Sequence, residues 1–442
     1  RLLRDPGHEV EVLLLWPADE LRGDPAANLA RLGGAGIVEL MDCQADTALA
    51  GSGCVVDAIF GTGFEGAPRA PADAAIEAIN RCGAPVVAAD VPSGVDGATG
   101  AAQGAAVGAA ATVTFHAPKL GHWIAPGRDL RGELVVAPIG IPAGAPAEAA
   151  AGLITDRVLD AAPGRGPGST KFSSGQVLVV GGSAGLTGAV CMAAMAAMRA
   201  GAGYATVAGP AELNDIFEVK LTEVMSRAIG SGRSLAEADA DAIAEAAEGA
   251  ACVALGPGLG RDDSALALAR VLAARIEVPL VVDADGLNAH AGRLGAFAGR
   301  TQPTVLTPHE GELARLLEVD SGAVKANRLD HAREAARISG AIVVLKGDDT
   351  IVCAADPERL AIKGFSSPAL ATAGTGDVLT GTVAALMARG MEPFAAACAA
   401  VHAHGRAGVA AARGRGAESV IASDVIDALP GGLAPQAAGE AG

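Results

Sequence analysis

Short apolar runs alternate with longer amphipathic segments along most of the chain. In the first third, these runs occupy residues 9–15, 54–61, 84–94, 111–115 and 133–140. Near-continuous apolar runs that end in glycine or aspartate are typical of parallel strands covered on both faces. Amphipathic stretches between them, for example 72–82, have the pattern of helices. The pattern therefore predicts a doubly wound α/β sheet in this part of the chain.

A second series of the same kind follows. Its apolar runs occupy 176–182, 205–209, 251–256, 278–285, 303–308 and 341–347. Helices are expected in the intervals and at 377–390 and 393–412, where apolar residues recur at helical spacing. Residues 141–152, IPAGAPAEAAAG, have the composition of a linker. We predict two α/β domains, 1–148 and 149–432, and a disordered Ala/Gly/Pro-rich tail after about residue 430.

Composition narrows the classes of partner. Lys and Arg total 33 against 50 Asp and Glu, so the net charge is −17, and we expect neither nucleic acid nor an anionic membrane as main partner. The seven cysteines contain no CxxC pair and no zinc-ligand spacing, which favours mostly buried, reduced thiols in a cytoplasmic protein. We find no signal peptide and no apolar run long enough to span a bilayer.

The segment 371–386, ATAGTGDVLTGTVAAL, carries the clearest chemical signal. Gly374-Thr375-Gly376-Asp377 stands directly before an apolar helix. The first N–H groups of a helix lack partners within it and favour anions, and glycines let a phosphate approach them closely. Asp377 could merely cap the helix, but a cap needs no preceding Gly-x-Gly. A phosphate site beside a general base uses both features, so we interpret Asp377 as that base.

Six segments in order resemble one family. They are VLVVGGSAGLTGAVCMAAMAAMRAGAGYATVA (177–208), GPGLG (256–260), VVDADGLN (281–288), LTPHEGELARLL (306–317), VVLKGDDTIV (343–352) and ATAGTGDVLTG (371–381). Gly-x-Gly-Asp before a C-terminal helix resembles the ribokinase-like superfamily. All six together, over about 170–415, resemble the ADP- or ATP-dependent NAD(P)H-hydrate dehydratases. The resemblance implies a ribokinase-like α/β/α domain that acts on NADH hydrate and NADPH hydrate.

The resemblance also implies roles for individual residues. The residues that would contact the hydrate are Ala189, Gly258, His309 and Asp377. The residues that would contact ADP or ATP are Lys346, Gly347, Asp348, Asp349, Thr350 and Gly376. Taken alone, three of these have ordinary alternatives: Gly258 as a plain turn, His309 as a structural histidine and Lys346 as a solvated lysine.

The implied reaction has two steps, with Mg²⁺ screening charge. Asp377 helps the ring hydroxyl of the hydrate to attack the terminal phosphate, and elimination of phosphate then restores NADH or NADPH. The sequence departs from the family pattern at two places. Thr170 precedes Lys171 where the family often has a histidine, and FSSPAL (365–370) replaces an Asn-rich stretch.

The first domain resembles a second family, the NAD(P)H-hydrate epimerases, through VVDAIFGTGFEGAPR (55–69), INRCGAPVVAADVPSGVDGATG (79–100) and ATVTFHAPKLGHW (111–123). The resemblance implies a Rossmann-like domain. It places K⁺ on Asp57 and Ser93, and the hydrate on Asp90 and on the loop Gly61, Thr62, Gly63, Phe64, Glu65, Gly66 and Ala67.

The epimerase family carries an Asn-Asn-Gly-Gly-Asp segment upstream of the residues that match here. The sequence given begins inside the helix which that segment would open. We therefore expect this chain to have impaired epimerase activity and a first domain of marginal stability.

Two other functions remain open at this stage. One is a kinase of a vitamin precursor or sugar on the same ribokinase-like fold, and the other is a non-catalytic nucleotide sensor. The intact Gly374-Thr375-Gly376-Asp377 argues against the sensor, because a pure binder needs no base there. ADP and ATP, and NADH hydrate and NADPH hydrate, stay open as substrates. The resemblance implies a homo-oligomer.

Overall fold

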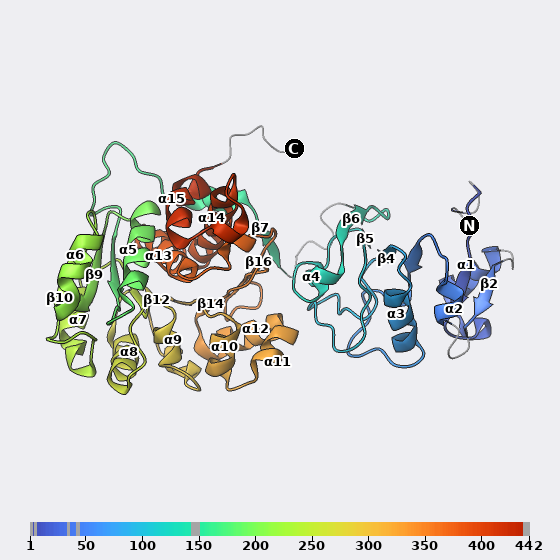
Figure 1. Ribbon diagram of the computed structural model, residues 1–442, viewed down its shortest axis with the longest axis horizontal. Coiled ribbons are helices and arrows are strands. Elements are labelled where there is room, and N and C mark those ends of the chain that lie inside the picture. Colours follow the sequence, from blue (N-terminus) through green and yellow to red (C-terminus); the bar gives the residue numbers. More distant parts are fainter. Residues whose placement is uncertain (1–2, 4–6, 33–35, 41–44, 143–150, 436–442) are drawn as a thin grey trace. The chain divides into compact units, whose positions relative to one another are not determined.

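The computed structural model describes residues 3, 7–32, 36–40, 45–142 and 151–435 (Figure 1). The chain divides into two compact units, Arg1–Ala145 and Pro146–Gly442. We call them unit 1 and unit 2 and describe each by itself.

Unit 1 is built on parallel strands. β3 (Val55–Asp57), β4 (Val86–Ala89), β5 (Ala111–Phe115) and β6 (Glu133–Ala137) form a sheet in sequence order, and β1 (Val12–Leu14) and β2 (Ile37–Glu39) form a separate parallel pair. The helices are α1 (Gly23–Leu32), α2 (Ala45–Leu49), α3 (Ala72–Arg81) and α4 (Gly127–Leu130). Buried residues of α3 recur three or four apart, so Ile76 and Ile79 pack in one core with Val55 and Val86.

Unit 2 contains one ten-stranded sheet in the order β10-β9-β8-β11-β12-β13-β14-β15-β16-β7. Its strands are β7 (Gly152–Ile154), β8 (Gln176–Val180), β9 (Tyr204–Pro210), β10 (Met225–Ile229), β11 (Cys252–Leu255), β12 (Leu280–Val282), β13 (Thr304–Leu306), β14 (Ile342–Leu345), β15 (Ile351–Cys353) and β16 (Leu360–Lys363). Neighbours pair in parallel except β14–β15 and β15–β16. The chain order reverses at β8, which has β9 on one side and β11 on the other. Ligands of open α/β sheets bind beyond the carboxyl ends of strands at such a point.

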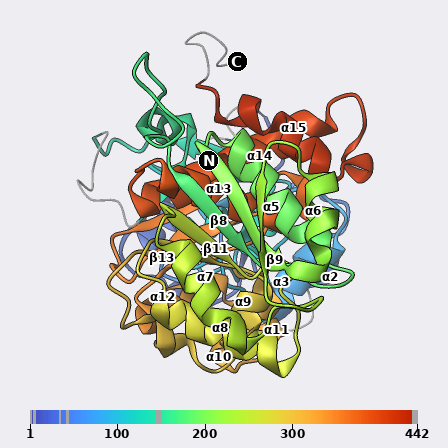
Figure 2. The same ribbon diagram turned by 90° about the vertical axis from the view of Figure 1, so that its left-hand side faces the viewer.

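Helices cover both faces of this sheet (Figures 1 and 2). The first layer contains α5 (Thr187–Arg199), α13 (Thr375–Ala388), α14 (Pro393–Ala412) and α15 (Ala422–Leu433). The opposite layer contains α7 (Ala240–Ala247), α8 (Asp263–Arg275), α9 (Asp285–Asn288), α10 (Glu310–Leu317), α11 (Ser321–Ala326) and α12 (Arg328–Ser339). The short helix α6 (Asn214–Lys220) packs beside β10. The residues of α13 are buried along almost its whole length, so this helix is the centre of its layer.

The predicted α/β fold class is confirmed, but several elements differ from expectation. The expected linker 141–152 is followed at once by β7, which pairs with β16. β2, β7, β10, β15 and β16 were not predicted as strands. Helix α15 extends through residues 430–433, so the prediction of a disordered tail was wrong for these residues. Residues 436–442 of the predicted tail lie outside the described part.

The cysteines mostly follow the prediction. Cys191, Cys252, Cys353 and Cys398 are buried free thiols, Cys82 is partly buried, and Cys54 is exposed, contrary to the general expectation. Cys43 lies outside the described residues. Across the described part of the chain, every helix is too short or too polar to cross a membrane.

Candidate active site

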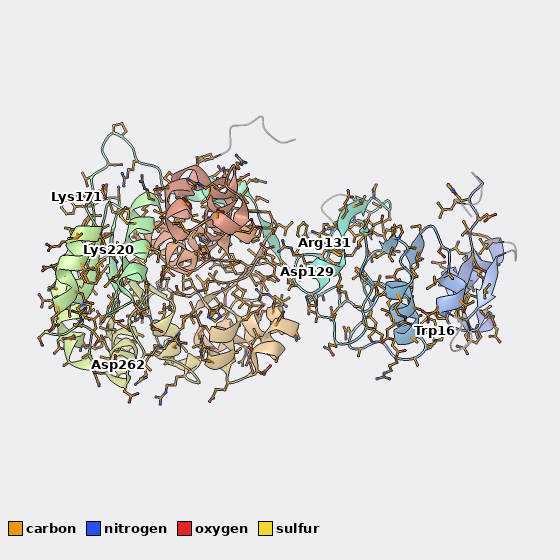
Figure 3. The ribbon with its side chains drawn as sticks, viewed as in Figure 1. Trp16, Asp129, Arg131, Lys171, Lys220 and Asp262 are labelled. Atoms are coloured by element: carbon orange, nitrogen blue, oxygen red, sulfur yellow. The ribbon has the colours of Figure 1, made fainter. Side chains whose placement is uncertain are left out.

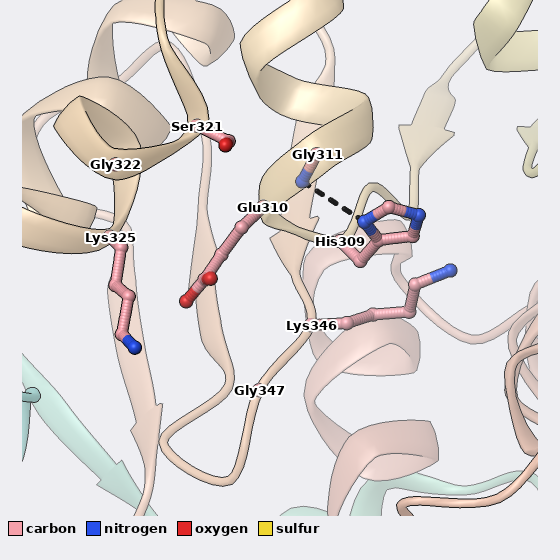
Figure 4. A pocket seen from close by; sticks show the side chains of 8 residues that line it. All are labelled: His309, Glu310, Gly311, Ser321, Gly322, Lys325, Lys346 and Gly347. Atoms are coloured by element: carbon pink, nitrogen blue, oxygen red, sulfur yellow. Dashed lines mark hydrogen bonds between the residues drawn. The ribbon is translucent and has the colours of Figure 1, made fainter.

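Loops from five strands of unit 2 meet the start of α13 beyond the carboxyl end of the sheet. Two cavities of about 540 Å³ each lie among these loops. The first, which we call the Asp377 cavity, is lined by Leu186, Ala189, Gly258, Gly260, Arg261, Ala284, Asp285 and Asp377. The second, the His309 cavity, is lined by His309, Glu310, Gly311, Ser321, Gly322, Lys325, Lys346 and Gly347 (Figure 4). The residues expected to contact the hydrate are thus divided between two neighbouring groups of loops.

The start of α13 is shaped by a glycine in the left-handed region. Gly374 has φ 90° and precedes the helix as its N-cap, and a Cβ there would come within 2.7 Å of the Met192 side chain. The Thr375 hydroxyl donates to the carbonyls of Leu370 (2.7 Å) and Thr372 (2.9 Å) and so fixes the preceding turn. Gly374 has no side chain to accept a hydrogen bond from the first turn of the helix. The N–H groups of that turn are therefore available to an anion.

Asp377 lies in this first turn and faces the first cavity. Because Gly374 is the N-cap, the alternative in which Asp377 caps the helix is wrong. Burial, reinforced by the nearby Asp283 carboxylate and opposed by Lys346, raises the pKa of Asp377 to about 7. A carboxylate of this basicity is suited to remove a proton near neutral pH.

Lys346 is held beneath the same helix turn by acidic residues. Its ammonium group donates to Asp283 Oδ1 (2.8 Å) and lies 3.7 Å from Glu312 Oε2. Burial lowers the pKa of Lys346, but Asp283, Glu312 and Asp377 outweigh burial and raise it, so the ammonium stays charged. A Cβ on Gly376 would lie 3.4 Å from Lys346 Nζ, so only a glycine leaves this charge fully open to the anion site. The solvated-lysine alternative does not describe Lys346, whose side chain is 20% exposed.

Asp283 organises this charge cluster. It follows β12, is 1% exposed, and accepts from Lys346 through one oxygen and from the Thr380 hydroxyl (2.7 Å) through the other. The next residue, Ala284, has φ 48°, a left-handed conformation that is costly without glycine and typical of functional sites. Asp283 therefore ties the end of β12 to α13 and to the lysine.

The opposite wall of the Asp377 cavity is formed by close backbone contacts. Gly258 has φ 60°, and a Cβ there would meet the Leu186 carbonyl at 2.5 Å and the Ala189 side chain at 3.2 Å. Ser183 Oγ donates to the Gly258 carbonyl (3.0 Å). The Gly258 loop therefore packs directly on the start of α5. A plain turn, the alternative considered for Gly258, would not require this close packing. The small Ala189 leaves space in the cavity beside Asp377.

His309 forms the N-terminal cap of α10. Its Nδ1 accepts from the Gly311 N–H (3.0 Å), and its own N–H donates to Glu312 Oε2 (2.9 Å). Burial lowers the pKa of His309, so the ring is neutral with its proton on Nε2. The ring is still 55% exposed and lies beside Lys346 in the His309 cavity (Figure 4). Nε2 lies 3.6 Å from Glu312 Oε1, beyond hydrogen-bond distance, so this capping histidine can both shape the helix and contact a ligand.

The turn 346–350 has its side chains largely engaged within the protein. Asp348 accepts from Ser366 Oγ (2.6 Å) and from the Ser367 N–H (2.8 Å). Asp349 is buried and pairs with Arg328 (3.0 Å), and the Thr350 hydroxyl bonds to Gly347. The side chains of this turn therefore fix its shape, and its backbone is the part available to a nucleotide.

Two departures from the family pattern also have defined places. Lys171, marked in Figure 3, lies over the rings of Phe172 (5.2 Å) and Tyr204 (5.9 Å). The stretch 365–370 leads into the turn before α13, and Ser367 Oγ donates to the Gly405 carbonyl (3.1 Å). The second departure thus still anchors the turn on α14.

In unit 1, Asp57 and Ser93 lie together at the ends of two strands. Ser93 donates to Asp57 through its hydroxyl (2.6 Å) and its N–H (2.8 Å), and both residues are 1% exposed. Burial raises the pKa of Asp57. Among the described residues, no basic side chain forms an ion pair with Asp57. A buried carboxylate with hydroxyl support and no cationic partner is a donor set that a hard cation fits.

The remaining expected residues of unit 1 lie near the same strand ends. The loop from Gly61 to Ala67 follows β3 and is mostly exposed, with Phe64 stacked on Phe60 at 4.5 Å between ring centres. Asp90 follows β4 with φ 70° and accepts from the Phe115 N–H (3.0 Å) and the Lys119 ammonium. Burial favours the neutral form of Asp90, but Lys119 and the Phe115 N–H outweigh it, so its pKa is lowered. Asp90 is therefore held ionised at a strand end.

Several residues of the site were missed by the sequence analysis. Asp283, Asp285, Glu312, Arg261 and Arg328 lie in or beneath the two cavities. Asp285 accepts from Arg261 Nε (2.8 Å) and the Gly260 N–H (3.1 Å), which fixes the loop after β11. Asp283 and Asp285 stand directly after an apolar run, and that position was a usable signal for a ligand site.

The fold and the site together define the class. A three-layer α/β unit with an uncapped helix start, a buried lysine and a carboxylate of raised pKa at the sheet switch point has the architecture of the ribokinase-like fold. The ribokinase-like superfamily protein of Enterococcus faecalis has the same fold, with a TM-score of 0.56 and 24% identity over 64% of this chain and 95% of that one.

Comparisons with known proteins identify the family. The protein-family model described as NAD(P)H-hydrate dehydratase matches residues 177–431. A second family model, described as YjeF-related protein N-terminus, matches residues 1–121. The bifunctional NAD(P)H-hydrate repair enzymes of Moorella thermoacetica and Salinibacter ruber are 41% and 38% identical, each over 97% of this chain and 83% of the relative. An ADP/ATP-dependent NAD(P)H-hydrate dehydratase from Bacillus subtilis, co-crystallised with ATP and Mg²⁺, has a TM-score of 0.56 and 26% identity over 64% of this chain and 97% of that one. The chain belongs to the family of bifunctional NAD(P)H-hydrate repair enzymes.

Proposed function

We propose that this protein repairs hydrated nicotinamide cofactors. Unit 2 dehydrates the S form of NADH hydrate or NADPH hydrate while ADP is split to AMP and phosphate, or ATP to ADP and phosphate. For unit 1 we propose the role of interconverting the R and S hydrates, whose level in this chain the test below measures, and the proposed domain limits are 1–148 and 149–432. The observation that carries the proposal is Asp377, a carboxylate with a pKa of about 7 beside the open N-terminus of α13.

The dehydration is explained by the groups around Asp377. The carboxylate takes the proton of the ring hydroxyl, and the hydroxyl oxygen attacks the terminal phosphorus of the nucleotide. The N–H groups at the start of α13 and the Lys346 ammonium stabilise the negative charge on the phosphoryl group. Inorganic phosphate then leaves, a ring carbon loses a proton, and the dihydronicotinamide is restored.

The residues expected to bind are assigned as follows. Ala189, Gly258, His309 and Asp377 contact the hydrate. The backbone of Lys346, Gly347, Asp348, Asp349 and Thr350, with the Lys346 ammonium and Gly376, contacts the nucleotide. The engaged side chains of Asp348 and Asp349 support a backbone mode of contact.

We assign Mg²⁺ to the nucleotide rather than to a protein cage. Within the described residues, no three His, Cys, Asp or Glu side chains are grouped so that they could hold a metal ion. Mg²⁺ commonly keeps several waters and is held mainly by substrate phosphates, which requires no such cage. The carboxylates of Asp283, Asp285, Glu312 and Asp377 would repel a bare polyanion, and a bound Mg²⁺ neutralises part of its charge.

In unit 1, we assign K⁺ to Asp57 and Ser93, and the hydrate to Asp90 and the loop 61–67. The Asp57 carboxylate is buried and forms no ion pair within the described part of the chain, which supports the cation site. We also propose a cytoplasmic homo-oligomer, and the net charge of −17 supports the absence of nucleic acid and anionic membrane partners.

The test follows the near-ultraviolet absorbance of dihydronicotinamide, which the hydrate lacks. The purified chain, Mg²⁺ and ADP or ATP are added to NADH hydrate from which NADH has been removed. Absorbance that returns only with nucleotide, together with one inorganic phosphate per NADH, supports the proposal. A stable phosphorylated product without NADH would instead identify a kinase. If the absorbance recovers only to the share of the S form, the chain has no epimerase activity under these conditions.

A further inference from the structure

The search for a residue beyond this assignment leads to a buried arginine beneath the His309 cavity. Arg328 is the first residue of α12 and is 2% exposed. A fully buried guanidinium is costly unless each side of it is paired. Its partners therefore indicate what it holds in place.

The partners of Arg328 belong to a helix and a turn that form two walls of the His309 cavity. Nη1 donates to Glu310 Oε1 on α10, next to His309. Nη2 donates to the Lys346 carbonyl (3.2 Å), and Nε lies 3.0 Å from Asp349 Oδ2. One planar guanidinium thus joins the helix capped by His309 to the turn that starts at Lys346.

Glycine at position 347 fits the same arrangement. A Cβ on Gly347 would collide with Arg328 Nη2 and would lie 2.8 Å from Asp349 Oδ1. The turn can therefore rest directly on the guanidinium, because it has no side chain at this position. Arg328 itself lies below the cavity and is not among its lining residues.

We propose that Arg328 is a positioning residue that sets the spacing between the hydrate-binding and nucleotide-binding walls. The inference rests on the proposed function, which places the hydrate against His309 and the nucleotide against 346–350. Two hydrogen bonds, to Glu310 and to the Lys346 carbonyl, and the ion pair with Asp349 hold α10 and the turn at once, so neither wall can shift without breaking a contact to the charged guanidinium. Loss of the fork should weaken the binding of both ligands and leave the chemistry at Asp377 nearly intact.

The test replaces Arg328→Lys, which keeps the charge and removes the fork. We expect KM for ADP and KM for the hydrate each to rise at least fivefold, with kcat within threefold of the wild type. Titration calorimetry with ADP alone should show a matching loss of nucleotide affinity. As a control, Ile243→Ala on α7 removes a fully buried side chain outside both cavities, so it lowers stability without raising either KM.

A folded Arg328→Lys variant with wild-type KM and ADP affinity would overturn the inference. If that variant does not fold, Glu310→Gln removes the negative charge from one partly exposed partner of the guanidinium, and we expect a threefold rise in both KM values. Unchanged values there would also overturn it. A wild-type protein that forms no NADH would refute the proposed function instead, and the ADP titration still decides the role of Arg328 in nucleotide binding.

Discussion

At the scale of single residues, Asp377 combines a position at the open start of α13 with an environment unfavourable to its charge. Its charge is disfavoured by Asp283, Asp285 and Glu312 and favoured by Lys346. A carboxylate in ordinary solvent would be too weak a base near neutral pH, and this environment strengthens it.

The first prediction concerns catalysis by Asp377. Asp377→Asn keeps the shape of the side chain and cannot accept the hydroxyl proton. We expect kcat to fall by about 10²- to 10⁴-fold, with the affinity for ADP within threefold of the wild type. Single-turnover kinetics and ADP titration measure the two quantities separately. Wild-type-like turnover in the variant would refute the assignment of the base.

The second prediction concerns stability and pH. The folded protein keeps a proton on Asp377 up to a pKa of about 7, whereas the unfolded chain loses it near the ordinary aspartate pKa of 3.8. Stability therefore falls as the pH rises through this window, and Asp377→Asn avoids that loss. We compare the unfolding free energy of the variant with that of the wild type at each pH. We expect this difference to change in favour of the variant by about 2 kcal/mol between roughly pH 5 and pH 8. Urea unfolding at both pH values measures it, and a constant difference would contradict the raised pKa.

At the scale of elements, the packing of α13 on α5 determines the shape of the Asp377 cavity. Gly381 of α13 faces the backbone of Ala193 in α5, and a Cβ there would overlap the Ala193 carbonyl oxygen. The two helices thus approach as closely as backbone allows, and they carry Asp377 and Ala189 on opposite sides of one cavity.

The third prediction tests this contact with Gly381→Ala. The change gains about 1 kcal/mol of helix propensity, but overpacking costs about 3 kcal/mol, so we expect a net loss of about 2 kcal/mol. The forced separation of the helices should also lower kcat/KM at least tenfold. Gly431→Ala in α15 is the matched control, since a Cβ there meets nothing within 4 Å. Equal stability of the two variants would show that α13 can shift freely.

The same elements show what the sequence could predict. The long apolar runs became β4, β5, β8, β9, β11 and β14, and Gly-x-Gly located the start of α13 correctly. Strands β15 and β16 were missed because they are short apolar runs between polar turns, and β7 was missed because it depends on pairing with the distant β16. Asp283 was missed as a site residue for the same reason, since Lys346 and Thr380, which define its role, come from later segments.

At the scale of the whole molecule, the two units differ in the size of their cores. The main buried cluster of unit 1 consists of Leu49, Val55, Ile76, Ala78, Ile79, Val86 and Val107. The main cluster of unit 2 extends over β7 to β16 and the helices α5, α13, α14 and α15. We therefore expect unit 1 to unfold at lower urea concentration than unit 2.

The fourth prediction uses this difference to detect K⁺. Both tryptophans, Trp16 and Trp123, belong to unit 1, and the single tyrosine, Tyr204, belongs to unit 2. At equal ionic strength, KCl should stabilise the tryptophan transition over LiCl by about 1 kcal/mol, as expected for tenfold excess over the dissociation constant. The tyrosine transition should not respond. The K⁺ effect should vanish in Asp57→Asn, and its persistence there would place the cation elsewhere.

The pairing of β7 with β16 has a consequence for the order of events during synthesis. Gly152 pairs with Ala361, about two hundred residues later in the chain. At a ribosomal rate of about 5–20 residues per second, the first strand of unit 2 waits roughly 10–40 seconds for its partner. Unit 1 leaves the ribosome complete during this interval. Unit 2 therefore closes only after unit 1 has left the ribosome.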